Sequence, residues 1–175
     1  VNDGGTMKTI PATDITTYVG GGITAASQWR ITANATGDLD PIASNWEVVD
    51  TDGYGSLGSA MTESSGIFTF PSTGYWLIQF IIETSATADE DYHTGGIHTT
   101  TDNSSYDSAT DCSSSFANSS GTHYHGASCH FLFDVTNTTN CKVKFKISSQ
   151  TNNSVTRGDT GNTTTGVTFI RLGDT

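Results

Sequence analysis

Short segments that alternate apolar and polar side chains, separated by clusters of turn-forming residues, make up most of this sequence. Alternation with a period of two predicts β-strands, and no long window shows the period of an amphipathic helix. The segments predicted as strands are 28–34, 45–49, 66–70, 75–83, 96–101, 129–136, 141–148 and 166–172. The Ser- and Asn-rich stretch 102–122 predicts a loop or a loose edge. The pattern therefore predicts an all-β fold.

The predicted strand at 75–82 is apolar on both faces, which is unusual for a strand with one face in water. Its two faces carry Trp76, Ile78, Phe80 and Ile82 on one side, and Tyr75, Leu77, Gln79 and Ile81 on the other. In a two-layer sandwich only one face packs on the opposite sheet. The second face needs a cover, which is either a neighbouring subunit or a loop of the same chain. We expect a subunit interface here, formed by Tyr75, Leu77 and Ile81 or alternatively by Trp76 and Phe80.

The segments 129–136 and 141–148 flank a turn at 137–140 and predict a hairpin. The register that sets Phe133 opposite Val143 makes one face of this hairpin wholly apolar. The other face then carries Lys142, Lys144 and Lys146 as a surface basic strip. The strip either protects an edge strand from aggregation or forms a small contact patch.

Composition agrees with a folded, turn-rich β protein. Ser, Thr, Asn and Gly make up nearly half of the 175 residues, and 8 Phe, 6 Tyr and 3 Trp concentrate in the predicted strands. The net charge of -11 comes with only 7 Lys and Arg. Nucleic-acid partners are disfavoured because phosphate binding needs a basic surface. No apolar run is long enough to cross a bilayer, so membrane insertion is not expected.

Three cysteines, Cys112, Cys129 and Cys141, cannot form a complete set of disulfides. One bridge with one free thiol and three free thiols are both open. The chain opens on Val1, which predicts a processed protein or a piece of a longer one. We expect residues 1–22 to be a lead-in segment and residues 23–175 to form a single domain.

The segment 66–80 resembles the central strand–turn–strand of the complement C1q and tumour-necrosis-factor-like jelly rolls. Their hallmark is an apolar strand ending in Phe-Thr-x-Pro, a tight turn to Gly and an aromatic-rich strand ending in Phe. The residues that fill this pattern are Phe68, Thr69, Pro71, Gly74, Trp76 and Phe80, with Trp76 where Tyr is usual. The strand at 166–172 resembles the family's last core strand, and Trp29 lies where the first strand would be. The stretch 102–122 has no clear family counterpart, and collagen-like repeats are absent.

This resemblance implies an antiparallel jelly-roll sandwich of about ten strands, a homotrimer with aromatic residues at its three-fold axis, and ligand recognition by apical loops. The Ser/Thr/Asn/Gly-rich, Lys-poor style is similar to C1q-like domains of phage virion and tail-fibre proteins. We therefore expect a non-enzymatic, extracellular head domain on a virion surface, such as a fibre tip or capsid decoration. Its partners would be other virion or fibre proteins and a cell-surface glycan or protein receptor. The alternative is a secreted C1q/TNF-like recognition protein or cytokine-like ligand.

Two kinds of metal site are candidates. His123 and His125 point to the same side of a strand, so a trimer could gather six imidazoles around an axial transition metal. Such a ring would make the domain a metal-stabilised spike tip. The alternative is a pair of surface histidines. The acidic clusters Asp38/Asp40, Asp50/Asp52 and 89–91 could bind Ca²⁺, although none matches an EF-hand loop.

Catalysis is not expected. The sequence has no Gly-x-Ser-x-Gly elbow, no phosphate-binding loop and no dinucleotide fingerprint. Abundant serine makes any Ser, His and Asp combination a coincidence of composition.

Overall fold

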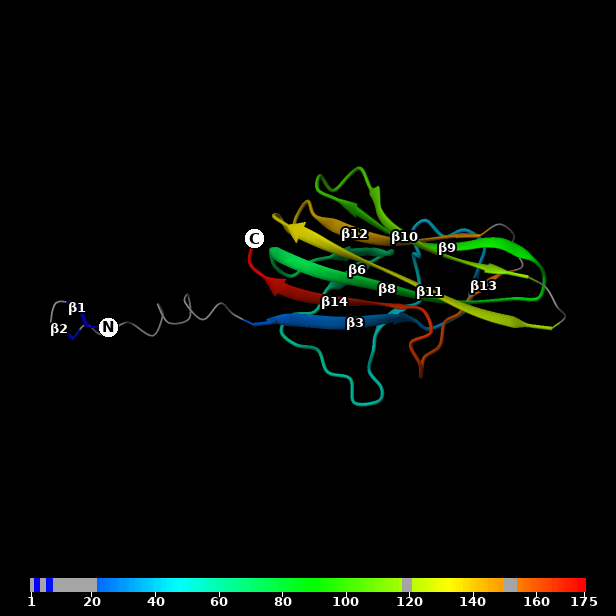
Figure 1. Cartoon of the computed structure of the whole chain (residues 1–175), viewed down its shortest axis with the longest axis horizontal. Helices are drawn as coiled ribbons and strands as arrows, with labels where there is room; N and C mark the ends of the chain where they lie inside the picture. Colours follow the sequence, from blue (N-terminus) through cyan, green and yellow to red (C-terminus); the bar gives the residue numbers. More distant parts are fainter. Residues whose placement is uncertain (1, 4–5, 8–21, 118–120, 150–153) are drawn as a thin grey trace.

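The chain folds into a sandwich of two antiparallel sheets (Figure 1). The computed structural model describes residues 2–3, 6–7, 22–117, 121–149 and 154–175, and within them it contains no helix. The five-stranded sheet, in the order β10-β9-β12-β7-β6, consists of β6 (Thr62–Ser64), β7 (Ile67–Thr69), β9 (Glu90–Thr100), β10 (Asp107–Phe116) and β12 (Lys142–Ser149).

The seven-stranded sheet is centred on the long strand β8. It consists of β3 (Ala25–Ile31), β4 (Ala35–Thr36), β5 (Trp46–Val48), β8 (Gly74–Ala86), β11 (His123–Val135), β13 (Val155–Thr156) and β14 (Gly166–Gly173). Strand β11 pairs with β8 along one edge, while β14 and β13 pair with its other edge. Strands β1 (Asn2–Asp3) and β2 (Thr6–Met7) pair only with each other. The predicted jelly-roll sandwich is confirmed, with twelve strands in the two sheets instead of ten.

Aromatic side chains from the two sheets interlock to form the core. The rings of Phe80 on β8 and Phe145 on β12 lie with their centroids 5.0 Å apart, and Phe68 stands edge-on to Phe145 at 5.4 Å. Gly95 on β9 makes room for this packing, because a Cβ atom there would lie 2.9 Å from a ring carbon of Phe80. Burying each such side chain contributes about 1.5–3 kcal/mol to folding. Alternation along the strands thus places the large apolar residues between the sheets.

The hairpin predicted for 129–136 and 141–148 is wrong. Strand β11 pairs with β8 in one sheet, and β12 pairs with β9 and β7 in the other. The inward-facing sets are nevertheless as expected, since Phe133 and Val143 are both buried. Two strands that face each other across a sandwich show the same alternation as two strands that pair side by side.

The stretch 102–122, predicted as a loop or a loose edge, contains an edge strand, β10, which is paired with β9 from Asp107 to Phe116. Its Ser- and Asp-rich sequence, DSATDCSSSF, has little of the β-branched and aromatic character of a typical strand. Hydroxyl contacts to the neighbouring strand help to hold it, such as Thr94 Oγ1 to Ser113 Oγ at 2.8 Å.

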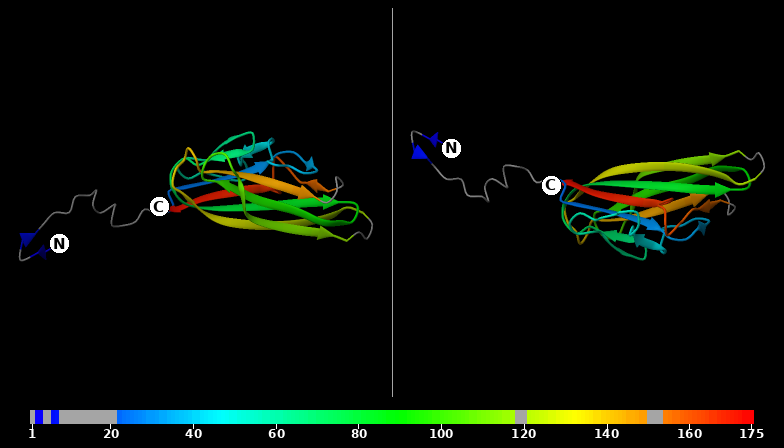
Figure 2. Two further views of the ribbon diagram at one scale, coloured as in Figure 1. Left: turned by 90° about the horizontal axis from the view of Figure 1, so that it is seen from above. Right: turned by 90° about the horizontal axis from the view of Figure 1, so that it is seen from below.

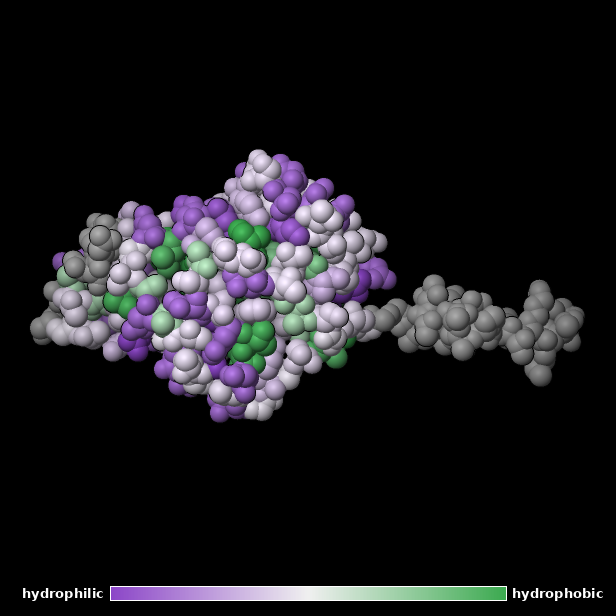
Figure 3. Space-filling view, turned by 180° about the vertical axis from the view of Figure 1, so that it is seen from behind, coloured by the Kyte–Doolittle hydropathy of each residue, from purple (hydrophilic) through white to green (hydrophobic). Residues whose placement is uncertain are grey.

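Strand β3 begins and β14 ends at the same end of the sandwich (Figure 2). The connection from β8 to β9 lies at the opposite end (Figure 1). On the side seen in Figure 3, hydrophobic residues form separate spots within a mostly polar surface. No helix that could span a membrane occurs among the described residues.

Candidate functional site

The outer face of the seven-stranded sheet carries a row of apolar residues across four strands. Strand pairing aligns Leu132 on β11, Leu77 on β8, Ile170 on β14 and Ala26 on β3. Leu132 is 53% exposed, and Leu77 and Ile170 are half-buried. Large apolar side chains that continue from strand to strand mark a contact surface more strongly than isolated ones.

Two further exposed residues lie at the same end of this face. Tyr75 on β8 is 40% exposed, and Leu172 on β14 is 45% exposed. We call Tyr75, Leu77, Leu132, Ile170 and Leu172 the apolar outer face. A shallow groove continues from Ile170 towards β3, and it is lined by Ala26, Ser27, Gln28, Tyr54, Gly55, Thr168 and Ile170.

A buried carboxylate oxygen adjoins the apolar outer face. Asp134 on β11 lies opposite Tyr75 on β8. Its Oδ1 atom is shielded from water and has no hydrogen-bond partner in the part of the chain that the structure describes. A buried acceptor without a donor costs about 1–3 kcal/mol. A donor from a second molecule docked on this face would satisfy it.

The structure separates the two alternatives predicted for the interface. Trp76 and Phe80 are 1% and 0% exposed and pack in the core, so an interface formed by these two residues is wrong. Tyr75 and Leu77 point away from the core, and Ile81 is half-buried two rows further along β8. The cause is the alternation of β8, which turns Trp76, Ile78, Phe80 and Ile82 towards the five-stranded sheet and the residues between them outwards.

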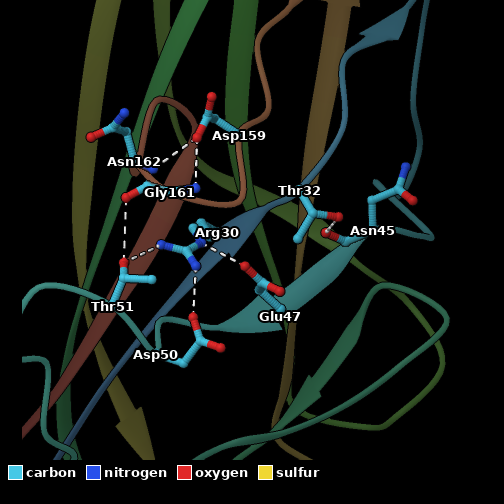
Figure 4. A network of polar contacts seen from close by, with 9 residues as sticks. All are labelled: Arg30, Thr32, Asn45, Glu47, Asp50, Thr51, Asp159, Gly161 and Asn162. Carbon is cyan, nitrogen blue, oxygen red and sulfur yellow. Dashed lines mark hydrogen bonds and ion pairs between the residues drawn. The ribbon is translucent and has the colours of Figure 1, made fainter.

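Next to Ile81, the same sheet face is covered by the chain itself. Arg30 on β3 is 1% exposed although it lies on the outer face, aligned through Gly166 with Ile81. Figure 4 shows its guanidinium under two loops: Nε donates to Glu47 Oε1 at 2.6 Å and Nη2 to Asp50 Oδ1 at 2.8 Å. The third donor, Nη1, contacts Thr51 Oγ1 at 3.0 Å.

A second loop closes over Arg30 from the other side. Thr51 Oγ1 donates to the carbonyl of Gly161, and Asp159 accepts from the backbone N–H groups of Gly161 and Asn162 (Figure 4). These two backbone hydrogen bonds hold the pKa of Asp159 below its usual value. Arg30 therefore fixes the loops that cover one half of the sheet, while the apolar outer face stays open.

The lysine strip lies on the outer face of the five-stranded sheet, but β12 is a central strand between β9 and β7. Protection of a sheet edge is therefore the wrong interpretation of Lys142, Lys144 and Lys146. Lys144 Nζ contacts Asp40 Oδ1 at 2.6 Å and Lys146 Nζ contacts Asp40 Oδ2 at 3.3 Å. The hydrogen bond from Lys144, followed by that from Lys146, lowers the pKa of Asp40.

A polar groove borders the same strip. Its lining comprises Thr94, Gly96, His98, Ser108, Asp111, Lys146 and Ser148. The side chain of Asp111 on β10 extends over Gly96 of β9. Glycine is needed there because a Cβ atom would lie 2.5 Å from Asp111 Oδ1. Burial lowers the pKa of His98, so this imidazole favours its neutral form. The groove is thus lined by both an acidic and a basic side chain, Asp111 and Lys146.

The predicted metal ligands lie elsewhere. His123 and His125 share the side of β11 that also carries Cys129, which faces the interior of the sandwich. Among the described residues no group of three or more His, Cys, Asp or Glu side chains is placed to hold a metal within one chain. A ring built from three chains stays a prediction.

The acidic clusters also have protein partners. Asp40 binds two lysines, Asp50 binds Arg30, and Asp38 Oδ1 accepts from the backbone N–H of Ser149 at 2.8 Å. Calcium binding at these clusters stays a prediction, and a calcium ion there would compete with those contacts.

Sequence reasoning missed the buried His93 on β9. It is 0% exposed, and its two ring nitrogens contact the hydroxyls of Ser154 at 3.0 Å and Thr156 at 3.1 Å. No local sequence pattern indicates this arrangement, because Ser154 and Thr156 are more than sixty residues away from His93 in the sequence.

Comparison with solved structures finds jelly rolls of the tumour-necrosis-factor type. Murine APRIL, in its structure at pH 5.0, matches with a TM-score of 0.60 at 11% identity, covering 85% of this chain and 98% of that one. Eiger TNF from S. frugiperda also gives 0.60 at 11% identity, covering 87% and 95%. Identities this low establish the fold alone. No protein-family model matches the sequence, and a search of the curated proteins finds no match.

Proposed function

We propose that this chain is a non-catalytic recognition domain that assembles as a homotrimer and presents loops to a cell-surface receptor. The observation that carries the proposal is the apolar row of Leu132, Leu77 and Ile170, on the part of the sheet face that the loops over Arg30 leave open. The resemblance of segment 66–80 to C1q/TNF-like jelly rolls supports the trimer, and the fold of the solved neighbours agrees with it.

A second copy of this chain fits the apolar outer face better than a charged partner does. The face carries Tyr75, Leu132 and Leu172 as exposed apolar residues. The adjoining Asp134 Oδ1 is buried without a hydrogen-bond partner among the described residues, and a hydroxyl or backbone N–H of a second copy would satisfy it. Interfaces between copies of one chain are richer in apolar area than the rest of the surface.

The arrangement of the ends supports a role in presentation. The first and last strands of the sandwich meet the surface at one end, which leaves the other end for a ligand (Figure 2). Loops on a rigid sandwich are common positions for binding residues. A receptor protein or a surface glycan is the partner class that such loops would recognise.

Light scattering on the full chain at micromolar concentration tests the assembly. We expect a solution mass three times the 18.4 kDa of one chain. A mass of one chain throughout the micromolar range would overturn the trimer.

A cytokine-like secreted ligand and a virion head domain are the two versions of this function. The solved neighbours include Eiger TNF and favour the first. The Ser/Thr/Asn/Gly-rich, Lys-poor composition favours the second. Labelled trimer would be offered in parallel to receptor ectodomains that bind TNF-family ligands and to bacterial cells. Saturable binding to the ectodomains supports the ligand, and saturable binding to cells supports the virion domain.

A further inference from the structure

Two cysteines lie together where the edges of the two sheets meet. Cys112 belongs to β10, the edge of the five-stranded sheet, and Cys129 belongs to β11, the edge of the seven-stranded sheet. The two strands are in contact, and both cysteines pack against the core. Cys112 is aligned with Gly95 of β9, Gly95 packs against the ring of Phe80, and Phe80 is the β8 partner of Cys129, which brings the two cysteines together. A hydrogen bond between the thiols shifts the pKa of each.

The third cysteine lies too far away to compete. Cys112 and Ile147 are both aligned with Gly95 of β9, whereas Cys141 precedes the first residue of β12. Six strand positions at about 3.3 Å each separate Cys141 from the level of Cys112, roughly 20 Å in total. A disulfide needs Cα atoms within about 7 Å. Of the three possible cysteine pairs, the structure therefore brings together only Cys112 and Cys129.

We propose that Cys112 and Cys129 form a disulfide bond that joins the two sheets at their shared edge. This bond goes beyond the proposed recognition function and does not depend on assembly. Oxidised glutathione is a sufficient oxidant, by two successive exchanges. The first thiolate attacks one glutathione sulfur and expels a glutathione thiolate. The second then attacks the protein sulfur of the mixed disulfide and expels the other. Two protein thiols are oxidised and one glutathione disulfide is reduced to two thiols.

The surroundings of the two thiols assign the order of attack. Cys112 is half-buried, so a small disulfide can reach it more easily than Cys129, which is 7% exposed. The hydrogen bond donated by Cys129, together with one from the backbone N–H of Gly95, lowers the pKa of the Cys112 thiol against the opposing effect of burial. The same hydrogen bond raises the pKa of Cys129. Cys112 is therefore the attacking thiolate, and Cys129 resolves the mixed disulfide.

Counting alkylated thiols tests the bond directly. Full-length protein would be incubated with oxidised glutathione, denatured without reductant, alkylated with N-ethylmaleimide and weighed as an intact chain. We expect one adduct, on Cys141, and a proteolytic fragment that links Cys112 to Cys129. Protein reduced first should carry three adducts. Three adducts after oxidation, a link that includes Cys141, or a stable glutathione adduct on Cys112 would each overturn the proposal.

Thermal unfolding provides a second readout. Closing the segment 112–129 restricts the unfolded chain, which should raise the midpoint of the oxidised protein over the reduced protein by about 5–10 °C. Cys112→Ser is the matched variant, since Cys112 is only half-buried and tolerates a smaller polar side chain. Its midpoint should not respond to dithiothreitol. A wild-type midpoint equally insensitive to dithiothreitol would contradict the bond, whether or not the chain is a trimer.

Discussion

The two sheets turn chemically different outer faces to their surroundings. The seven-stranded sheet exposes Leu132 and Tyr75, with Leu77 half-buried between them. The five-stranded sheet carries the half-buried lysines of β12, two of which form ion pairs with Asp40. Polar and charged side chains satisfied within one chain need no partner, whereas an uncovered apolar row does. The difference indicates which side of the sandwich assembles and which side stays in water.

Tyrosines on the two faces give the sharpest test of this difference. Tyr75 on β8 is 40% exposed and Tyr92 on β9 is 46% exposed, each on the outer face of its own sheet. Tyr75→Asp and Leu132→Asp would place a carboxylate in the apolar outer face. Because an unpaired charge buried in an apolar contact costs several kcal/mol, we expect association to weaken at least about a hundredfold. Light scattering should then give the mass of one chain.

Tyr92→Asp is the matched control, and it should leave the solution mass and the midpoint of thermal unfolding unchanged. Equal dissociation by Tyr92→Asp and Tyr75→Asp would show that the two faces do not differ in assembly. A trimer that survives Leu132→Asp would place the interface elsewhere on the molecule.

On the seven-stranded sheet, the loops that Arg30 holds in place can be destabilised without changing the apolar outer face. Arg30→Met removes the guanidinium that donates hydrogen bonds to Glu47, Asp50 and Thr51. Because both carboxylates keep some contact with water, we expect a loss of about 2–3 kcal/mol in the free energy of unfolding, measured by urea denaturation. Arg157→Lys is the control. Arg157 makes a partly exposed ion pair with Glu83 at 3.8 Å and lies over the ring of Tyr124, and because lysine keeps the charge, this variant should cost less than about 0.5 kcal/mol. Equal losses in the two variants would contradict a special role for Arg30.

The smallest effect is expected on the five-stranded sheet. Asp40 is 41% exposed, so Asp40→Asn should cost less than about 1 kcal/mol at neutral pH. Lys144 and Lys146 lower the folded-state pKa of Asp40 below its usual 3.8, so the contribution is complete above that value. As the pH falls through the lower folded-state pKa, the contribution is lost. Urea denaturation of both proteins across the acid range should show their difference vanish, and a difference that grows in acid would reverse the assignment.

The sequence predicted all eight of its proposed strands, because strong alternation and turn clusters coincide there, although β9 and β11 each begin six residues before the predicted start. It left the stretch that contains β10 open between a loop and a loose edge, because its serines and aspartates match a loop in composition although backbone pairing with β9 makes it a strand. It predicted an interface on β8, but it did not separate Trp76 from Tyr75, since both faces are apolar. Only the second sheet, packed against Trp76, decides which face is inside.

The sequence by itself determined which side chains of a strand share a face, because a period of two assigns alternate residues to opposite faces. Val143 and Phe133 were placed inside correctly even though the hairpin between their strands does not exist. Which strands pair and which side chains meet was decided only by the tertiary structure. Pairing of β11 with β8, the contacts of Arg30, and the meeting of Cys112 with Cys129 all join segments from different parts of the fold. Alternation is a local property, whereas the choice of neighbour depends on how the whole chain crosses between the two sheets.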